Sequence, residues 1–443
     1  MENNYINVIG AGLAGCEAAW LLSRLKVNVH LYEMKPVKRS PAHKSDNYGE
    51  LVCSNSLKAN NIDNATGLLK EELRRLGSLI IEAADKTAVP AGGALAVDRD
   101  DFSQYITDKI NSSEYITVIN EPVTKIPDDA ITIVATGPLT DGELFQDIVR
   151  ITGADDLHFF DAAAPIVTLD SIDMNYAFFA SRYGKGGDDY INCPMNKEEY
   201  LNFYRELISA ELADVEGFDR DISFEGCMPI ETMAKRGEDT MRFGPLKPVG
   251  LIDPRTGKEP YACLQLRQDN KAKTMFNLVG FQTRLKFGEQ KRVFGMIPGL
   301  YNAEYNRYGV MHRNTYLCSP KVLTDRYNMK DRPDLFFAGQ ITGVEGYNAS
   351  TGSGFLAAFY AYMRFKGIEP MVVFDNETML GSMADYVSSA SSDNFAPMNP
   401  NFGIIKPYEG KFKKKEKKEK YMAIALRSLK RIDEISSYID SLT

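Results

Sequence analysis

A glycine motif at the start of the chain constrains its fold more than any other segment. The apolar run YINVI leads into Gly10, Gly12 and Gly15, and a second apolar run, NVHLYE, ends at Glu33. In a dinucleotide-binding βαβ unit, glycines at this spacing allow a tight turn, approach of the pyrophosphate and close helix packing, and an acid about twenty residues later binds a ribose hydroxyl. A glycine turn without a ligand is the alternative, but the strand and helix on either side favour a dinucleotide.

Two later segments indicate which dinucleotide binds. ITIVATGPL (131–139) is an apolar strand that leads to Gly137, and DLFFAGQITGVEGY (334–347) is another that leads to Gly339. A first domain that resumes so late in the chain is typical of two-domain flavoproteins, and Arg99 lies in a segment like the one such proteins place beneath the adenosine. We therefore predict FAD rather than NAD. The predicted cofactor-binding residues are Gly10, Gly12, Gly15, Glu33, Arg99, Gly137, Gly339 and Tyr347.

The order of these elements predicts an α/β protein with a discontinuous, Rossmann-like FAD-binding domain and an inserted α+β domain. We place the first part of the FAD-binding domain at 1–170, the insertion at 171–300 and the second part at 301–443. The lysine-rich run KFKKKEKKEK (411–420) is expected to belong to a basic C-terminal helix with a solvated face of Glu–Lys pairs.

Composition limits the classes of partner. The chain has 443 residues, a net charge of −8 and a pI of about 5.3, so a polyanion has to bind a local basic patch. One such patch is predicted around Lys235 and Arg236. No apolar run approaches the roughly twenty residues that cross a bilayer, and the N-terminus enters the first strand without a signal peptide. We expect a cytoplasmic protein without membrane contact.

The cysteines divide into two groups. Their spacing suits neither a metal site nor a disulfide framework, so no metal is predicted. Cys16 and Cys263 lie in apolar stretches and are expected to be buried. Cys53 and Cys227 lie among small, polar and turn-forming residues, which suits the wall of a pocket, and nearby cations could activate either thiol.

Several segments together resemble one family. NVIGAGLAGCEAAW, LVCSNSLKAN, FEGCMPIE, RFGPLKPVGL, YGVMHRNTY and LFFAGQITGVEGY are similar to blocks of the flavin- and folate-dependent RNA uridine-5-methyltransferases of the TrmFO type. The likeness covers nearly the whole chain, and several of the blocks are specific to that family rather than to flavoproteins in general.

The resemblance implies an FAD-dependent RNA (uracil-5-)-methyltransferase that forms 5-methyluridine. In that family, reduced FAD accepts a one-carbon unit at N5 from methylenetetrahydrofolate and delivers it to uracil C5, and NADPH or NADH reduces the flavin. Cys227 matches the cysteine that adds to uracil C6, and Cys53 matches the cysteine assigned as the base at C5. The target base has to leave its stack, so an RNA loop suits better than a duplex. No obligate protein partner is implied.

Departures from the family pattern affect the expected donor and target. TRLKFGEQ (283–290) has Arg284 where the family has His and Phe287 where it has Trp, and these changes remove hydrogen-bonding and stacking surface. These two changes argue against folate as the one-carbon donor, and formaldehyde is the other one-carbon source considered. We assign Arg284, Phe287, Lys235 and Arg236 as candidate contacts to the substrate or RNA. The preferred target is 23S rRNA, because divergent members of the family methylate it; the T-loop uridine of tRNA is the alternative.

Two other classes stay open at this point. An FAD oxidoreductase of a small molecule would not need Cys227 for turnover. A noncatalytic RNA-binding flavoprotein would bind RNA without one-carbon chemistry. Formation of 5-methyluridine in RNA distinguishes the methyltransferase from both.

Overall fold

A five-stranded parallel sheet forms the centre of the first lobe. The computed structural model describes residues 4–40, 42–153, 157–184, 187–214, 228–410, 412–413 and 415–443. The sheet order is β16-β7-β1-β2-β6, and each neighbouring pair is parallel. Its strands are β1 (Tyr5–Ile9), β2 (Asn28–Tyr32), β6 (Ile116–Ile119), β7 (Thr132–Val134) and β16 (Leu335–Phe337). The predicted α/β fold is confirmed, and the late strand β16 joins the same sheet beside β7.

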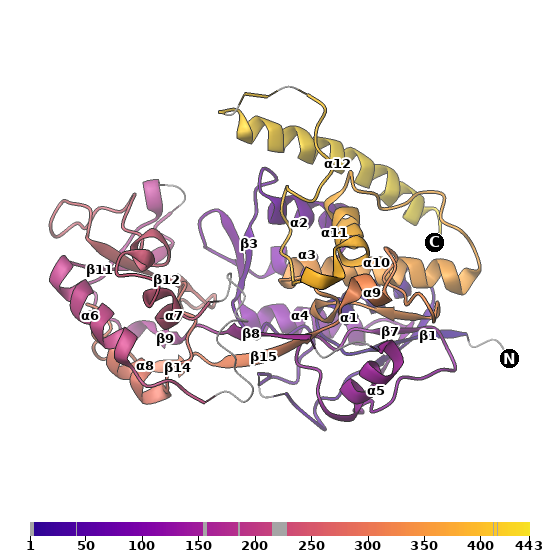
Figure 1. The fold of residues 1–443 in the computed structure, drawn as a ribbon, viewed down its shortest axis with the longest axis horizontal. Helices are drawn as coiled ribbons and strands as arrows, with labels where there is room; N and C mark the ends of the chain where they lie inside the picture. Colours follow the sequence, from indigo (N-terminus) through magenta and orange to yellow (C-terminus); the bar gives the residue numbers. More distant parts are fainter. Residues whose placement is uncertain are drawn as a thin grey trace.

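Helices and a small sheet surround these strands (Figure 1). The sheet has the order β3-β5-β4 and is antiparallel. Its strands are β3 (Ser56–Ala59), β4 (Ala88–Val89) and β5 (Ala94–Val97). The helices of this lobe are α1 (Leu13–Arg24), α2 (Ala65–Arg75), α3 (Leu79–Lys86), α4 (Arg99–Asn111), α5 (Gly142–Thr152), α9 (Ser319–Val322), α10 (Tyr347–Lys366), α11 (Met379–Ser389) and α12 (Lys417–Asp440). Short 3-10 turns occur at η5 (Gln340–Thr342) and η6 (Ser392–Asn394).

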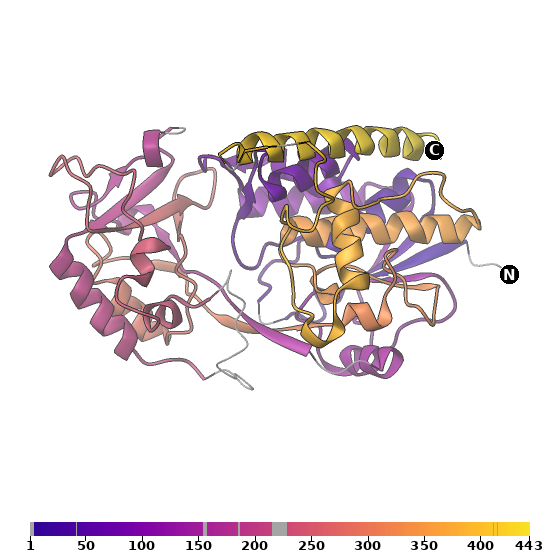
Figure 2. The ribbon, with the colours of Figure 1, turned by 45° about the horizontal axis from the view of Figure 1, so that its top comes forward.

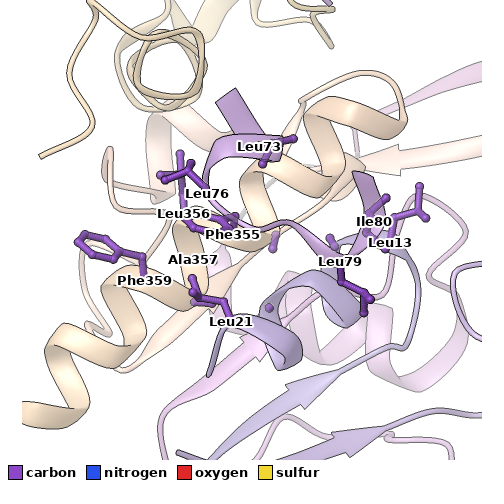
Figure 3. Close-up of a cluster of buried hydrophobic side chains, with 14 of the residues drawn as sticks. Leu13, Leu21, Leu73, Leu76, Leu79, Ile80, Phe355, Leu356, Ala357 and Phe359 are labelled. Atoms are coloured by element: carbon purple, nitrogen blue, oxygen red, sulfur yellow. The ribbon is translucent and has the colours of Figure 1, made fainter. Parts of the chain in front are cut away.

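The packing of α10 against α1 holds the two distant parts of this lobe together. A Cβ atom on Gly354 would lie 2.2 Å from the carbonyl oxygen of Ala14, so only glycine permits this approach. The surrounding core is apolar and fully buried (Figure 3). Side chains from α1, α2, α3 and α10, and from Leu76 directly after α2, meet there: Leu13, Leu21, Leu73, Leu76, Leu79, Ile80, Phe355, Leu356, Ala357 and Phe359.

The second lobe has its own sheet and core. Its six-stranded sheet has the order β10-β11-β12-β13-β9-β14, and all neighbouring pairs are antiparallel. The strands are β9 (Ile166–Thr168), β10 (Phe178–Phe179), β11 (Tyr190–Met195), β12 (Ala262–Gln268), β13 (Met275–Leu278) and β14 (Tyr305–Arg307). The helices are α6 (Lys197–Ser209), α7 (Ile230–Ala234) and α8 (Phe287–Phe294), with 3-10 turns η1 (Leu169–Ser171), η2 (Arg182–Gly184) and η4 (Thr240–Phe243).

A two-stranded ladder connects the lobes. β8 (Leu157–Ala162) pairs with β15 (Met311–Tyr316) in antiparallel fashion, and both views show it running between them (Figures 1 and 2). The sheet of the second lobe starts at β9, before residue 171, and ends at β14, after residue 300. The inserted lobe is therefore wider at both ends than the sequence-based limits.

The C-terminal helix α12 packs on α2 through one apolar face. It begins at Lys417, so part of the lysine run precedes it, and Lys411 and Lys414 lie outside the described residues. Arg74 and Arg75 of α2, another basic pair, are engaged in ion pairs with Glu71, Asp85 and Asp433. Within the described ranges, no helix is both long enough and apolar enough to span a membrane.

A buried carboxylate on α2 joins three helices. Glu72 accepts hydrogen bonds from the backbone N–H groups of Met379 (2.7 Å) and Leu380 (2.9 Å) at the start of α11, and from the hydroxyl of Ser428 on α12. Burial raises the pKa of Glu72 from 4.5 to about 7. The helices of this face thus share one carboxyl group that binds a proton more readily in the folded chain.

This carboxyl predicts a pH-dependent stability. Between pH 4.5 and about 7 the folded chain binds more protons at Glu72 than the unfolded chain, so its contribution to stability falls as pH rises. We expect Glu72→Gln to flatten the decline in unfolding free energy across this window, by at most about 1.4 kcal/mol per pH unit. Chemical denaturation at several pH values measures this, with the exposed Glu434→Gln as control. An unchanged slope in Glu72→Gln would contradict the assignment.

Candidate functional site

A cavity of about 450 Å³ lies at the carboxyl ends of β1, β2, β7 and β16. This is where ligands bind in open parallel sheets. Of the predicted cofactor residues, the following line it: Gly10, Gly12, Glu33, Gly137, Gly339 and Tyr347. Cys53 lines the same cavity. The structure therefore brings the glycine motif, the late strand and one candidate catalytic cysteine into one place.

The three motif glycines have different roles. Gly10 has φ +99°, which turns the chain between β1 and α1. A Cβ atom on Gly15 would lie 1.8 Å from the carbonyl oxygen of Gly10, so Gly15 permits close packing of the helix on the turn. A Cβ atom on Gly12 would meet no protein atom within 4 Å. Protein packing does not require glycine at position 12, whereas a closely approaching ligand does.

The acid at the end of β2 is held in place by backbone groups. The Glu33 carboxylate accepts hydrogen bonds from the N–H groups of Ala11 (2.9 Å) and Lys35 (3.0 Å). It is buried, yet it lines the cavity. Because each carboxylate oxygen accepts more than one hydrogen bond, Glu33 retains capacity for ribose hydroxyls.

Polar groups around the start of α10 complete the wall. Gly346, with φ +94°, precedes the helix, and its N-terminus adjoins the cavity. Asn348 donates to the carbonyl oxygen of Leu57 (2.8 Å), while its buried Oδ1 has no hydrogen-bond partner among the described residues. Glu345 and Gln340 are hydrogen-bonded at 2.5 Å. Neither Glu345 nor Asn348 was identified as a site residue from the sequence.

The loop that carries Cys53 is attached to α10. The backbone N–H groups of Cys53 (2.9 Å) and Ser54 (3.1 Å) donate to the hydroxyl of Tyr347. The Sγ atom of Cys53 lies 3.9 Å from the carbonyl oxygen of Ala162, at the end of β8. Burial raises the pKa of Tyr347 above its ordinary value, so its hydroxyl stays protonated. Tyr347 therefore adjoins the cavity and also positions the cysteine loop.

Arg99 does not lie where the sequence led us to expect. It is absent from the cavity wall; its guanidinium donates to the carbonyl oxygens of Leu51 (2.5 Å) and Cys53 (3.0 Å) and pairs with Asp269 at 3.0 Å. The physical reason is the buried carboxylate of Asp269, which comes from the second lobe and draws the side chain toward the cysteine loop. Arg99 contacts the site through that loop.

The remaining candidate residues lie in the second lobe. Cys227 lies outside the described residues. Lys235 and Arg236 follow α7 and are exposed. The N–H of Arg284 donates to the Glu231 carboxylate at 2.8 Å, and the side chain of Arg284 is half-buried. Phe287, at the start of α8, is 55% exposed.

Phe287 ends a ladder of three aromatic rings. It stacks on Tyr308 with ring centroids 4.6 Å apart, and Tyr308 stacks on Tyr305 at 4.9 Å. Arg307, between the two tyrosines in sequence, donates to the carbonyl oxygen of Val52 beside Cys53. The segment that carries the two tyrosines is therefore joined to the cysteine loop, across a sequence separation of 255 residues that hides the contact from sequence analysis.

The other cysteines behave as structural residues. Cys16, Cys193, Cys263 and Cys318 are buried, and burial raises the pKa of Cys263 to about 12. This confirms the expectation for Cys16 and Cys263. In the part of the chain that the structure describes, no cluster of three or more His, Cys, Asp or Glu side chains could hold a metal ion.

The fold and the site define a two-lobed α/β protein of the dinucleotide-binding class, with a cysteine loop in its cofactor cavity. Residues 5–369 match the family model "Glucose inhibited division protein A". The structure of Aquifex aeolicus GidA in its form II crystal has a similar fold, with a TM-score of 0.68 and 16% identity over 99% of this chain and 74% of that chain.

Relatives with much higher identity share a single description. The methylenetetrahydrofolate–tRNA-(uracil-5-)-methyltransferase TrmFO of Acetivibrio thermocellus is 60% identical over 98% of this chain and 99% of its own. The TrmFO of Listeria monocytogenes serotype 4b is 58% identical over 97% of this chain and 99% of its own. The chain belongs to the GidA family and, within it, to the TrmFO group.

The preference for 23S rRNA as the target is wrong. The relatives that match nearly the whole chain at 56–60% identity are named for tRNA. The preference rested on departures from the family pattern, such as Arg284 and Phe287, and on the divergent family members that methylate 23S rRNA. These two substitutions leave the rest of the chain highly similar to enzymes named for tRNA, so they are a poor guide to the RNA target.

The glycine roles predict opposite effects of two substitutions. Gly12→Leu places its side chain in the cavity, so we expect the melting temperature of the flavin-free protein to stay near wild type while bound flavin is lost. Gly15→Ala should instead destabilise the flavin-free protein by about 1–3 kcal/mol, because its Cβ meets Gly10. Flavin absorbance per protein and thermal unfolding measure the two effects. Full flavin content in Gly12→Leu would contradict the predicted pyrophosphate contact.

Proposed function

We propose that this protein is an FAD-dependent enzyme that methylates C5 of a uracil in tRNA, with methylenetetrahydrofolate as the one-carbon donor. The observation that carries the proposal is Cys53, in the same cavity as the dinucleotide motif. The names of its relatives support the folate donor and the tRNA target. Within tRNA, the T-loop uridine is the target that the family resemblance implies.

The cavity suits FAD. Gly12 leaves room for the pyrophosphate, Glu33 would hold the ribose, and Gly137 and Gly339 line the same wall. The N-terminus of α10 directs partial positive charge at the cavity, and the buried Oδ1 of Asn348 is available to a hydrogen-bond donor. When bound, the flavin supplies reducing electrons and relays the one-carbon unit, with NADPH or NADH as the source of reduction.

Two cysteines would act on the uracil. Uracil C5 is a weak nucleophile until a thiolate adds to C6. We assign this addition to Cys227: its sulfur bonds to C6, and the electron pair of the C5–C6 double bond moves to C5 and its neighbouring carbonyl. After C5 has bonded to the one-carbon unit, Cys53 would take the C5 proton, so that an S–H bond forms and the C–H pair returns to the ring. The double bond is restored when the Cys227 sulfur leaves C6.

The RNA would contact the second lobe around the cysteine loop. The target base has to leave its stack to reach a cavity at the carboxyl ends of the strands. Phe287 presents an exposed ring at the end of the aromatic ladder, and unpaired bases stack on such rings. Exposed Lys235 and Arg236, eight and nine residues after Cys227, suit contacts to phosphates. Arg284, which lies between Arg236 and Phe287 in the sequence, is a further candidate for contact with the RNA.

The proposal is tested in a host that lacks its own 5-methyluridine enzymes. We expect expression of this protein to place 5-methyluridine in tRNA and not in 23S rRNA, and we expect Cys227→Ala and Cys53→Ala to abolish it. Mass spectrometry of the digested RNAs measures the modified base, and Cys263→Ala, which alters a buried structural thiol, is the matched control. Unmodified tRNA in cells that contain folded, flavin-loaded protein would overturn the proposal.

The aromatic ladder gives a second prediction. Phe287→Leu keeps an apolar side chain but removes the stacking face. Because stacking of a base on an aromatic ring contributes about 1–3 kcal/mol to binding, we expect the KM for tRNA to rise about 5-fold or more. Phe287→Trp should retain the wild-type KM. Tyr301→Leu is the control, since Tyr301 is an 82% exposed aromatic residue of the same lobe. Steady-state methylation at saturating folate measures these values, and equal KM values for Phe287→Leu and Tyr301→Leu would exclude the stacking role.

A further inference from the structure

Three arginine side chains from separate elements hold the loop at residues 51–55. Arg99, at the start of α4, donates to the carbonyl oxygens of Leu51 and Cys53. Arg307, on β14, donates to the carbonyl oxygen of Val52. The loop residue at the centre of these contacts is Cys53, so its main chain is fixed from both sides.

The third arginine comes from the middle of the second lobe. Arg267, on β12, donates to Ser54 Oγ (2.7 Å) and Asn55 Oδ1 (3.1 Å), and it lines the cavity. Asn55 in turn donates to the carbonyl oxygens of Val97 and Gln268. Because Arg99 belongs to the first lobe while Arg267 and Arg307 belong to the second, the cysteine loop is held jointly by the two lobes.

The loop is in an electropositive environment. Arg267 is buried, and Arg99 and Arg307 are partly buried. Among the described residues, Asp269 is the one carboxylate that forms an ion pair with any of the three. Three guanidinium groups thus share a single buried counter-charge.

The neighbouring charged groups that the structure describes do not offset this excess. Glu50, just before the loop, accepts from the N–H groups of Lys44 and Ser45 and lies 4.0 Å from the ammonium of Lys35. Burial lowers the pKa of His43, which therefore favours its neutral form. Tyr347, on α10, faces the loop as a neutral hydroxyl. The net charge that Cys53 faces from these elements is positive.

We propose that Arg99, Arg267 and Arg307 act as positioning residues that hold Cys53 at the cavity as a thiolate. The inference rests on the proposed role of Cys53 as the base, because a thiolate is the form that accepts the C5 proton: the C–H bond breaks, the S–H bond forms, and no other reactant is needed. A cation near a thiol favours the ionised form. Two of the arginines come from the second lobe. The reactivity of Cys53 therefore depends on the position of that lobe relative to the cysteine loop.

The test uses alkylation of Cys53 by iodoacetamide in flavin-loaded protein, followed over pH. A Cys227→Ser background removes the other candidate nucleophile, and the four remaining cysteines are buried. Peptide mass spectrometry identifies Cys53 as the modified residue. In Arg307→Gln and Arg267→Gln, we expect the midpoint of the pH profile to rise by about one unit and the rate at neutral pH to fall about tenfold. Arg307→Lys, which keeps the positive charge, should recover most of the rate.

A control separates charge from general disturbance of the lobe. Arg182 is a half-buried arginine of the second lobe that donates to Gln265 and Val249. In the part of the chain that the structure describes, it forms no hydrogen bond or ion pair with residues 51–55, so Arg182→Gln should leave the profile unchanged. Should Arg307→Gln fail to fold, Arg267→Gln gives an independent measurement. A wild-type profile in a folded, flavin-loaded Arg307→Gln or Arg267→Gln would overturn the inference.

Alkylation needs no RNA, so the two proposals fail separately. A raised midpoint in the arginine variants together with unmodified tRNA would refute the methyltransferase proposal and leave the arginine contacts as assigned. Methylated tRNA together with an unchanged pH profile in the arginine variants would support the methyltransferase proposal and refute the role of the arginines.

Discussion

The close packing of α10 on α1 is the constraint on which the rest of the structure depends. It is possible because Gly354 allows the backbone of α10 to reach the carbonyl oxygen of Ala14, and it accompanies the pairing of β16 with β7. Together they return residues 335–366 to the glycine motif of the first strand. The cavity exists because two parts of the chain, separated by an entire second lobe, form its walls.

The second lobe contributes side chains to the proposed active site. It is inserted between β7 and β16, and the antiparallel pair β8 and β15 carries the chain out and back. Its arginines Arg267 and Arg307 contact the loop of Cys53, which belongs to the first lobe. The proposed active site is therefore a junction: the first lobe provides the cofactor cavity, and the second lobe holds the reactive loop beside it.

Local patterns predicted the features that local physics determines. The turn at Gly10, the strand before Gly137 and the strand before Gly339 each have a short sequence signature, and all three lie where the sequence places them. Arg99 was harder because its partner, Asp269, is 170 residues away. The contacts of Arg267 and Arg307 carry no local signal, since they depend on how two lobes meet. The prediction of 23S rRNA was wrong because it gave a few substitutions more weight than the rest of the chain, which resembles enzymes named for tRNA.

In the proposed mechanism, Cys53 acts as the base at uracil C5 within the flavin cavity. Release of tritium from tRNA labelled at C5 of uracil measures this step directly, because the proton that leaves C5 is counted in the solvent. If Cys53 is the base, the complete, folate-supplied enzyme releases tritium, and a folded, flavin-loaded Cys53→Ala variant releases none. Release at the wild-type rate by Cys53→Ala would contradict this role of Cys53.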